Sequence, residues 1–137
     1  MIGRLPNFLV IGAAKSGTTA LWSLLRQHPQ VFMPALKEPH HFAFDADQPA
    51  PQFRGPGANL HRDAVTGTDA YRALFADAGE ALAVGEASAT YLYVAASVER
   101  IRAAIPDARL VAILRQPADR AYSSYLHLKR QGREPAP

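Results

Sequence analysis

A lysine near the N-terminus stands in a glycine-rich turn, where its charge could bind an anion. Residues 8–19 read Phe-Leu-Val-Ile-Gly-Ala-Ala-Lys-Ser-Gly-Thr-Thr, so Lys15 lies between two glycines. The apolar run before the turn is typical of a strand buried on both faces, and Thr18 or Thr19 can cap the helix expected after it. Backbone amides and the helix macrodipole attract anions at such a turn. The sequence therefore predicts a phosphate-type site around Lys15.

The glycine spacing is close to that of a nucleoside-triphosphate P-loop but differs from it in the position of the lysine. A P-loop reads G-x-x-x-x-G-K-[ST], with the lysine directly after the second glycine. Gly12 and Gly17 keep this gap, whereas Thr18 stands at the lysine position and Lys15 lies inside the loop. The same residues also fit an ordinary strand-to-helix turn with a solvated lysine.

An arginine after another apolar run offers a second anion site. Arg115 directly follows residues 110–114, which we expect to form a buried strand, and Ser123 lies further on in the helix expected to follow. Arginine can bind a phosphate through two parallel hydrogen bonds, and Ser123 reaches the same anion only if its helix leans over the strand end. The alternative is that Arg115 pairs with Asp119 and Ser123 only packs. Two such sites suit a ligand with two separated phosphate-like groups.

Strands and helices are expected to alternate along the chain. This alternation predicts a three-layer α/β fold with a mostly parallel sheet, which begins with a P-loop-like strand-loop-helix unit. Ligands of such sheets bind at the carboxyl ends of the strands, and the polar clusters of this chain fall there. The predicted strands are 8–11, 31–33, 81–85 and 110–114, and the predicted helices are 18–27, 70–78 (capped by Asp69), 94–105 (with Val98, Ile101 and Ile105 inward) and 117–130.

The composition fits a single globular domain over residues 1–137, with 48% hydrophobic and 20% charged residues. Residues 46–66 are rich in proline and glycine and are expected to form an irregular loop. A net charge of +3 without a run of like charges argues against a nucleic-acid partner. No apolar run reaches the roughly 20 residues of a membrane span. The absence of cysteine excludes disulfides and thiolate chemistry and is compatible with the cytoplasmic location that we expect.

Four motifs in sequence order resemble the sulfotransferase family. They are residues 8–19, Lys37-Glu-Pro-His40, Gly85-Glu-Ala-Ser88, and Leu114-Arg-Gln-Pro-Ala-Asp-Arg-Ala-Tyr-Ser-Ser-Tyr125. The similarity is greatest to the bacterial and glycan-type branch, which includes the heparan-sulfate sulfotransferases. The resemblance implies an enzyme that moves a sulfuryl group from 3′-phosphoadenosine-5′-phosphosulfate (PAPS) to a hydroxyl or amine acceptor and releases 3′-phosphoadenosine-5′-phosphate (PAP), without a metal ion.

The resemblance also implies which residues bind the donor. The loop motif matches the part of the family that binds the 5′-phosphosulfate, with Lys15 on the bridging oxygen that gains charge during transfer. The arginine and the serine eight residues after it match the 3′-phosphate site. The donor-binding residues implied in this way are Lys15, Ser16, Gly17, Thr18, Thr19, Arg115 and Ser123.

In the glycan-type members the glutamate of the second motif takes the proton of the acceptor, which implies that Glu38 is the base and that Lys37 and His40 support it. His40 is the alternative base, since other branches of the family use histidine. The family often has phenylalanine after the motif histidine, where this chain has His41, and we expect His41 to face solvent.

The third motif and the single tryptophan each have two interpretations. Glu86 and Ser88 match residues near the acceptor pocket, but a glutamate at a strand end also commonly pairs with an arginine. Trp22 lies close in sequence to the glycine-rich turn around Lys15, and we expect it to belong to the core rather than to bind adenine. Nothing in the composition identifies the acceptor, which is expected to be a small molecule or a glycan.

Family members continue well beyond the second anion motif, whereas this sequence stops at Pro137. We therefore expect the chain to be a fragment, the product of a truncated gene, or a domain that a partner completes, with an exposed sheet edge that favours association with a second copy. We expect weaker donor binding and reduced turnover. The competing functions are a non-catalytic PAPS- or PAP-binding remnant and a Mg²⁺-dependent P-loop phosphotransferase, which would need an aspartate at a strand end.

Overall fold

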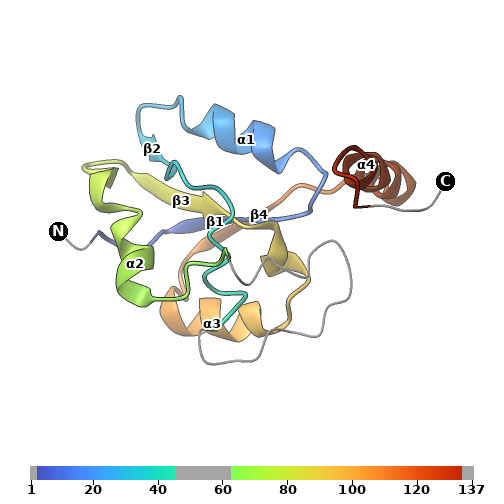
Figure 1. Ribbon diagram of the computed structural model, residues 1–137. Coiled ribbons are helices and arrows are strands. Elements are labelled where there is room, and N and C mark those ends of the chain that lie inside the picture. Colours follow the sequence, from blue (N-terminus) through green and yellow to red (C-terminus); the bar gives the residue numbers. More distant parts are fainter. Residues whose placement is uncertain (1–2, 46–62, 134–137) are drawn as a thin grey trace.

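Four parallel strands form one sheet in the order β2-β3-β1-β4 (Figure 1). The computed structural model describes residues 3–45 and 63–133. Most of the predicted loop at 46–66 lies outside these residues, and its described part, 63–66, contains no helix or strand. The sheet confirms the predicted α/β class. Its strands are β1 (Phe8–Gly12), β2 (Val31–Phe32), β3 (Ala83–Ala87) and β4 (Arg109–Ala112).

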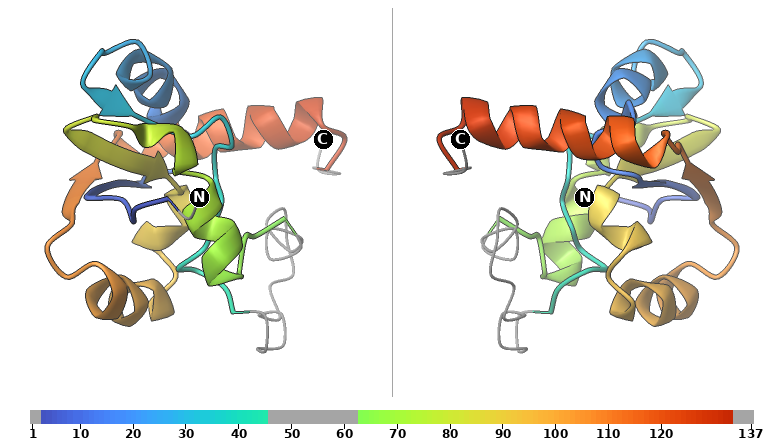
Figure 2. Two further views of the ribbon diagram at one scale, coloured as in Figure 1. Left: turned by 90° about the vertical axis from the view of Figure 1, so that its left-hand side faces the viewer. Right: turned by 90° about the vertical axis from the view of Figure 1, so that its right-hand side faces the viewer.

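Helices cover both faces of the sheet, as the predicted three-layer arrangement requires. Figure 1 shows α1 on one face and α2 and α3 on the opposite face, and Figure 2 shows α4 extending away from the sheet. None of the described helices is long and apolar enough to cross a membrane. The helices are α1 (Thr18–Leu25), α2 (Thr68–Ala73), α3 (Ala96–Ala104) and α4 (Pro117–Arg130), with short 3-10 helices η2 (Ala76–Ala78) and η3 (Ala89–Leu92).

The alternation of side chains along β1 divides the core into two clusters. Leu9 points toward α2, α3 and η3, where it packs in a cluster that contains Tyr71 and Ile101. Phe8 and Val10 point toward α1 and pack in a second cluster. Neighbouring residues of a strand face opposite sides of the sheet, so an apolar run without polar interruption is what a central strand needs. The prediction of a doubly covered first strand is therefore confirmed.

The third strand runs further than predicted and carries a carboxylate into the core. We expected it to end at Gly85, but β3 continues to Ala87, and Glu86 pairs in register with Leu9 of β1. Gly85 has a packing role, because a Cβ there would lie 2.4 Å from Cζ of Phe8. The alternation of the strand turns Glu86 to the same face as Leu9, among the aromatic residues of that cluster.

The prediction that residues 110–114 form a buried strand is wrong in its burial. β4 lies at the edge of the sheet and pairs with β1 alone in the described part of the chain. Leu110 is 55% exposed, and Leu114, just after the strand, is 73% exposed. Val98 of α3, predicted to point inward, is also exposed, whereas Ile101 and Ile105 are buried as predicted. An apolar sequence creates a buried strand only where other elements cover it, and the described elements leave this edge open.

The second helix also differs from the prediction. We expected Asp69 to cap a helix over residues 70–78, but α2 begins at Thr68, and Gly67 stands at its N-cap without a side-chain hydrogen bond. The α-helix ends at Ala73, and the 3-10 helix η2 follows. Asp69 lies in the first turn, where a negative charge still interacts favourably with the helix dipole.

Candidate functional site

The loop at residues 13–17, called the donor loop after its predicted role, connects β1 to α1 and leaves the helix N-terminus without a side-chain cap. The N-cap residue is Gly17, with φ 100°, a conformation that favours glycine. The prediction that Thr18 or Thr19 caps the helix is wrong, because both lie in its first turn. The first amides of a helix have no partner within the helix. The first backbone N–H groups of α1 are thus free to donate hydrogen bonds to an anion in this loop.

This loop contains a buried hydroxyl and a lysine, and a second lysine, Lys37 of another loop, lies close enough to act on the first. Oγ of Ser16 is buried and has no hydrogen-bond partner among the described residues, so a polar group is available inside the turn. The pKa of Lys15 is lowered, first by desolvation and then by the positive charge of Lys37. Two lysines close enough to repel one another are stabilised when an anion lies between or beside them. The donor loop therefore fits a bound phosphate or sulfate group.

Arg115 reaches this loop from the far end of the chain. Its Nη1 donates to the backbone oxygen of Lys15 at 3.2 Å, although 100 residues separate the two in sequence. Arg115 also lines an open cavity of about 450 Å³ beside the donor loop, together with Ala13, Tyr93 and Arg120. Sequence reasoning missed Arg120, although it stands in the quoted motif five residues after Arg115.

Ser123 and the alternative partner of Arg115 lie elsewhere on α4. Ser123 is half-buried and does not line the cavity that Arg115 lines. Asp119 has its amide capped by Oε1 of Gln116 at 3.0 Å, and no ion pair joins its carboxylate to Arg115 in the described structure. The alternative in which Arg115 pairs with Asp119 is therefore wrong for this structure. The common 3′-phosphate site of Arg115 and Ser123 stays a prediction.

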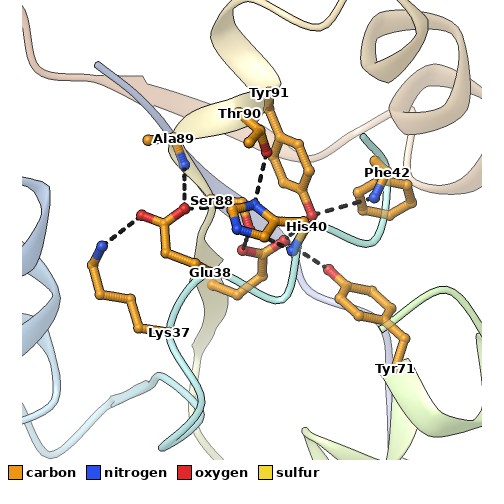
Figure 3. Close-up of polar contacts among 10 residues, drawn as sticks. Lys37, Glu38, His40, Phe42, Tyr71, Ser88, Ala89, Thr90 and Tyr91 are labelled. Atoms are coloured by element: carbon orange, nitrogen blue, oxygen red, sulfur yellow. Dashed lines mark hydrogen bonds and ion pairs between the residues drawn. The ribbon is translucent and has the colours of Figure 1, made fainter. Parts of the chain in front are cut away.

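The loop that carries Lys37, Glu38 and His40 is fixed to the carboxyl end of β3 (Figure 3). The amide of Glu38 donates to the backbone oxygen of Ala87 at 2.9 Å, and the amide of His40 donates to Oγ of Ser88 at 3.0 Å. Both Glu38 and His40 have positive φ, 61° and 54°. Residues other than glycine adopt this conformation only where their surroundings hold them in it.

The carboxylate of Glu38 has three polar neighbours and remains accessible. Nζ of Lys37 lies 2.6 Å from its Oε1, and the amide of Ala89 donates to its Oε2 at 2.9 Å. Nδ1 of His40 lies 3.6 Å from the same Oε2. The Glu38 side chain is 30% exposed, so it can contact a ligand while these neighbours orient it.

The two histidines of this loop have different surroundings. The His40 side chain is only 4% exposed, and its Nδ1 is hydrogen-bonded to Oγ1 of Thr90 at 2.9 Å. Burial lowers the pKa of His40, although the charge of Glu38 acts in the opposite direction. The prediction that His41 faces solvent is wrong: its ring stacks on Tyr71 at 3.9 Å, and its Nδ1 donates to the backbone oxygen of Val65 at 2.7 Å. A ring that adjoins an aromatic cluster gains more from stacking than from hydration.

Glu86 and Ser88 lie beneath the loop, fully buried. Oε1 of Glu86 accepts hydrogen bonds from the hydroxyls of Tyr91 at 2.6 Å and Tyr71 at 3.2 Å, and its Oε2 accepts one from Ser88 at 2.9 Å. Burial raises the pKa of Glu86 to about 7, although these hydrogen bonds lower it. The alternative of an arginine partner is wrong within the described residues. Contact of Glu86 or Ser88 with an acceptor stays a prediction.

Trp22 is part of the core, as predicted. Its ring packs against the cluster that contains Val10 and Met33, and its Nε1 donates to the backbone oxygen of Pro34 at 3.2 Å. The guanidinium group of Arg26 covers the ring at 4.7 Å.

Backbone conformation distinguishes three residues that the sequence motifs single out. In the ranges 3–45 and 63–133, the residues other than glycine with positive φ are Lys15, Glu38 and His40. Strained conformations of this kind cluster at functional sites. The same three residues were predicted to be catalytic from the resemblance of their motifs. Their role stays a prediction, and the backbone provides an independent reason to make it.

The chain resembles solved and curated sulfotransferases. The crystal structure of a sulfotransferase from Alicyclobacillus acidocaldarius superposes with a TM-score of 0.87 at 39% identity, over 98% of this chain and 54% of that one. The bifunctional heparan sulfate N-deacetylase/N-sulfotransferase 2 of Bos taurus is 37% identical over 131 residues, 94% of this chain and 14% of that protein. Human carbohydrate sulfotransferase 15 is 30% identical over 156 residues, 90% of this chain and 27% of that protein.

The chain thus spans only part of the length of these relatives, and about half of the solved one. A sequence profile of the Sulfotransferase family matches residues 6–137, which include all four motifs. Together with the superposition, this match confirms the family expected from the motifs: the chain belongs to the Sulfotransferase family.

Proposed function

We propose that this chain forms the donor-binding and base-bearing part of a sulfotransferase that uses PAPS. The observation that carries the proposal is the contact of Arg115 with the backbone of Lys15, which joins the two predicted anion sites at the carboxyl edge of the sheet. A donor with a 5′-phosphosulfate and a 3′-phosphate has two anionic groups to match them. We also propose that residues 1–137 form a single domain.

The donor loop would hold the 5′ end of the donor. The uncapped amides at the start of α1, the unpartnered hydroxyl of Ser16 and the charge of Lys15 are suited to its oxygens. Thr18 and Thr19, in the first turn, add hydroxyls, and Arg115 with Ser123 would bind the 3′-phosphate. PAPS supplies the sulfuryl group, which leaves PAP behind. Lys15 would stabilise the negative charge that develops on the bridging oxygen as that bond breaks.

Glu38 is the better candidate for the base. Its carboxylate is 30% exposed and oriented by Lys37 and the amide of Ala89, whereas the ring of His40 is almost completely buried and engaged with Thr90. Glu38 would take the proton of the acceptor hydroxyl or amine as the new bond to sulfur forms. His40 would then orient Glu38 through the 3.6 Å approach of its Nδ1.

The relatives suggest the class of acceptor. Their names include a heparan sulfate N-sulfotransferase and a carbohydrate sulfotransferase, so we propose a glycan or another small polyhydroxylated or amino compound. Lys37, which is next to Glu38 and partly exposed, would bind this acceptor. We also propose that the exposed edge at β4 associates with a second copy and that the protein is cytoplasmic, as the sequence led us to expect.

A sulfuryl-transfer assay tests this proposal. The chain is incubated with PAPS that carries a radiolabelled sulfuryl group and with glucosamine oligosaccharides. One set has free amines, and in the other the amines are acetylated, so that only hydroxyls can accept the sulfuryl group. We expect labelled product with wild type and a loss of about a hundredfold or more with Glu38→Gln, as for removal of a general base. Glu80→Gln, the same change at an exposed residue outside the site, serves as the control. Equal activity of wild type and Glu38→Gln would contradict the assignment of the base.

A second candidate function is donor binding without transfer. The exposed apolar side chains along and beside β4 favour it, because the described elements leave this edge of the sheet uncovered. PAP binding with undetectable transfer to either oligosaccharide would support this alternative. The phosphotransferase alternative is weaker, because β1, β3 and β4 end in Gly12, Ala87 and Ala112 rather than in an aspartate that could hold Mg²⁺.

A further inference from the structure

Two backbone amides of the loop at residues 37–42 are held by hydroxyl groups that share one carboxylate. The amide of His40 donates to Oγ of Ser88 at 3.0 Å, and Ser88 in turn donates to Oε2 of Glu86 at 2.9 Å. The amide of Phe42 donates to the hydroxyl of Tyr91 at 3.4 Å, and Tyr91 donates to Oε1 of Glu86 at 2.6 Å. Figure 3 shows Ser88 beside His40 and Tyr91 beside Phe42, the two contacts with the loop.

The direction of these hydrogen bonds follows from the groups that make them. An amide can only donate, so the oxygens of Ser88 and Tyr91 accept from the loop, and their own hydrogens must find an acceptor. In this fully buried position the acceptor is Glu86. Without it, two buried hydroxyl groups would lose the partner that orients them.

The loop that is held in this way has an unusual backbone. Glu38 and His40 have φ of 61° and 54°, which side-chain-bearing residues rarely adopt. Such conformations persist where the surroundings determine the backbone at several points. Three contacts do so here: the amide of Glu38 on Ala87, and those of His40 and Phe42 on the two hydroxyls. Glu86 lies behind two of the three.

We propose that Glu86 is a positioning residue, which through Ser88 and Tyr91 holds the loop in the backbone conformation that presents Glu38 and His40. Because its side chain has no exposed surface, we assign it this role in place of the predicted contact with the acceptor. The proposal rests on the proposed function only where it gives the loop a catalytic task; the control of the loop backbone by Glu86 is a separate claim and can be measured without turnover.

The chain offers a matched set of variants. Glu86→Gln keeps the shape of the side chain, and the two tyrosine hydroxyls at the Oε1 position favour the amide oxygen there. The amide nitrogen then faces Ser88 and cannot accept its hydrogen. Ser88→Ala removes the acceptor of the His40 amide directly. Tyr71→Phe removes the third hydroxyl that donates to Glu86, yet this hydroxyl holds no amide of the loop, and the ring that stacks on His41 remains. It is therefore the control for a general disturbance of the buried carboxylate.

Amide hydrogen exchange, followed residue by residue by NMR, tests the proposal. In Glu86→Gln and Ser88→Ala we expect exchange of the His40 amide to accelerate by about tenfold, as for the loss of roughly 1.4 kcal/mol. The amides of Leu9 and Val10 in the central strand should keep their rates, and Tyr71→Phe should leave the His40 rate at the wild-type value. An unchanged His40 rate in Glu86→Gln would overturn the proposal, as would an equal acceleration at Leu9 and Val10, which indicates loss of global stability instead.

A kinetic comparison connects the loop to the reaction. We expect Glu86→Gln to lower kcat by about tenfold with the KM for PAPS unchanged, because the donor loop lies on other elements. A rise in the KM for PAPS with unchanged kcat would contradict a role in presenting Glu38. Absence of transfer by the wild-type chain would instead contradict the proposed function, and the exchange rates would still decide whether Glu86 positions the loop.

Discussion

Nη1 of Arg115 donates to the backbone oxygen of Lys15 at 3.2 Å, and this contact connects the segment after β4 to the donor loop. It leaves the other guanidinium nitrogens of Arg115, which is exposed, available beside the cavity next to the loop. A lysine at this position could not form the same planar fork, because its three donors lie on one nitrogen. The side chain of Arg115 is thus suited both to shape the loop and to bind a phosphate.

We predict that Arg115→Lys weakens PAP binding by at least about tenfold, the free energy of one charged hydrogen bond. The matched ligand is adenosine 5′-monophosphate, which lacks the 3′-phosphate and should lose little affinity. Competition binding with both ligands measures the two effects. A loss of the same size for both would mean that Arg115 acts only through the shape of the loop.

Gly17→Ala is predicted to destabilise the protein by about 1–2 kcal/mol, because the left-handed conformation at φ 100° is costly for a residue with a Cβ. The space around Gly17 is open, so the effect should come from the backbone alone. Gly67→Ala is the control: this N-cap residue has φ −71°, and its added Cβ would lie no closer than 3.8 Å to another side chain. Urea unfolding measures both variants, and equal stability of the two would contradict the requirement for glycine in the donor loop.

The sequence predicted the fold class and the order of the elements because β1 and β3 contain short apolar runs and the helices have apolar residues at helical spacing. The motifs also singled out Lys15, Glu38 and His40, the described non-glycine residues that the structure gives a positive φ. A short sequence motif specifies the local backbone conformation as well as the side chains, so it can single out residues of unusual conformation. The predicted helix at 117–130 coincides with α4, since Pro117 marks its start and a glycine follows its end.

The errors concern long-range contacts, which a local pattern does not contain. Residues 110–114 are apolar enough for a buried strand, but their burial depends on elements beside them. His41 looks like a loop residue until α2 brings Tyr71 against its ring. Glu86 has the same sequence neighbours whether it binds an arginine, an acceptor or three hydroxyls, and only the packing of Tyr71 and Tyr91 distinguishes these cases.

The open edge has a measurable consequence. We predict that Leu114→Ala, at a side chain that is 73% exposed, changes the free energy of unfolding by less than about 0.5 kcal/mol. Leu9→Ala, the same change at a fully buried side chain, should cost about 2–5 kcal/mol. Urea unfolding compares the two at low protein concentration. A large loss of unfolding free energy in Leu114→Ala would show that this side chain is covered in solution. If a dimer covers it, the loss should increase when the measurement is repeated at higher protein concentration.

Glu86 predicts a dependence of stability on pH. Its pKa is about 7 in the folded protein and 4.5 in an exposed side chain, so the folded state holds this proton more tightly than the unfolded state. The resulting stabilisation is complete below pH 4.5 and is lost as the pH rises through about 7. The negative charge of Glu38 contributes to the same shift.

Unfolding free energies of wild type and Glu86→Gln over this range test the sign. Between pH 4.5 and pH 8, wild type should lose on the order of 3 kcal/mol relative to the variant, which cannot ionise at this position. The difference between the two proteins removes the contributions of the other titrating groups. A wild type that gains stability relative to Glu86→Gln as the pH rises would mean that the hydrogen bonds to the carboxylate outweigh its burial.

The central claim, a donor site with two anionic subsites, is tested most directly by calorimetric titration with PAP and, separately, with ATP and Mg²⁺. We predict that wild type binds PAP and responds little to ATP, and that Lys15→Ala and Arg115→Ala each weaken PAP binding by at least about tenfold. Arg130→Ala, which removes the same charge from the exposed end of α4, should bind as wild type does. Binding of ATP that requires Mg²⁺ and is indifferent to Arg115→Ala would contradict the account.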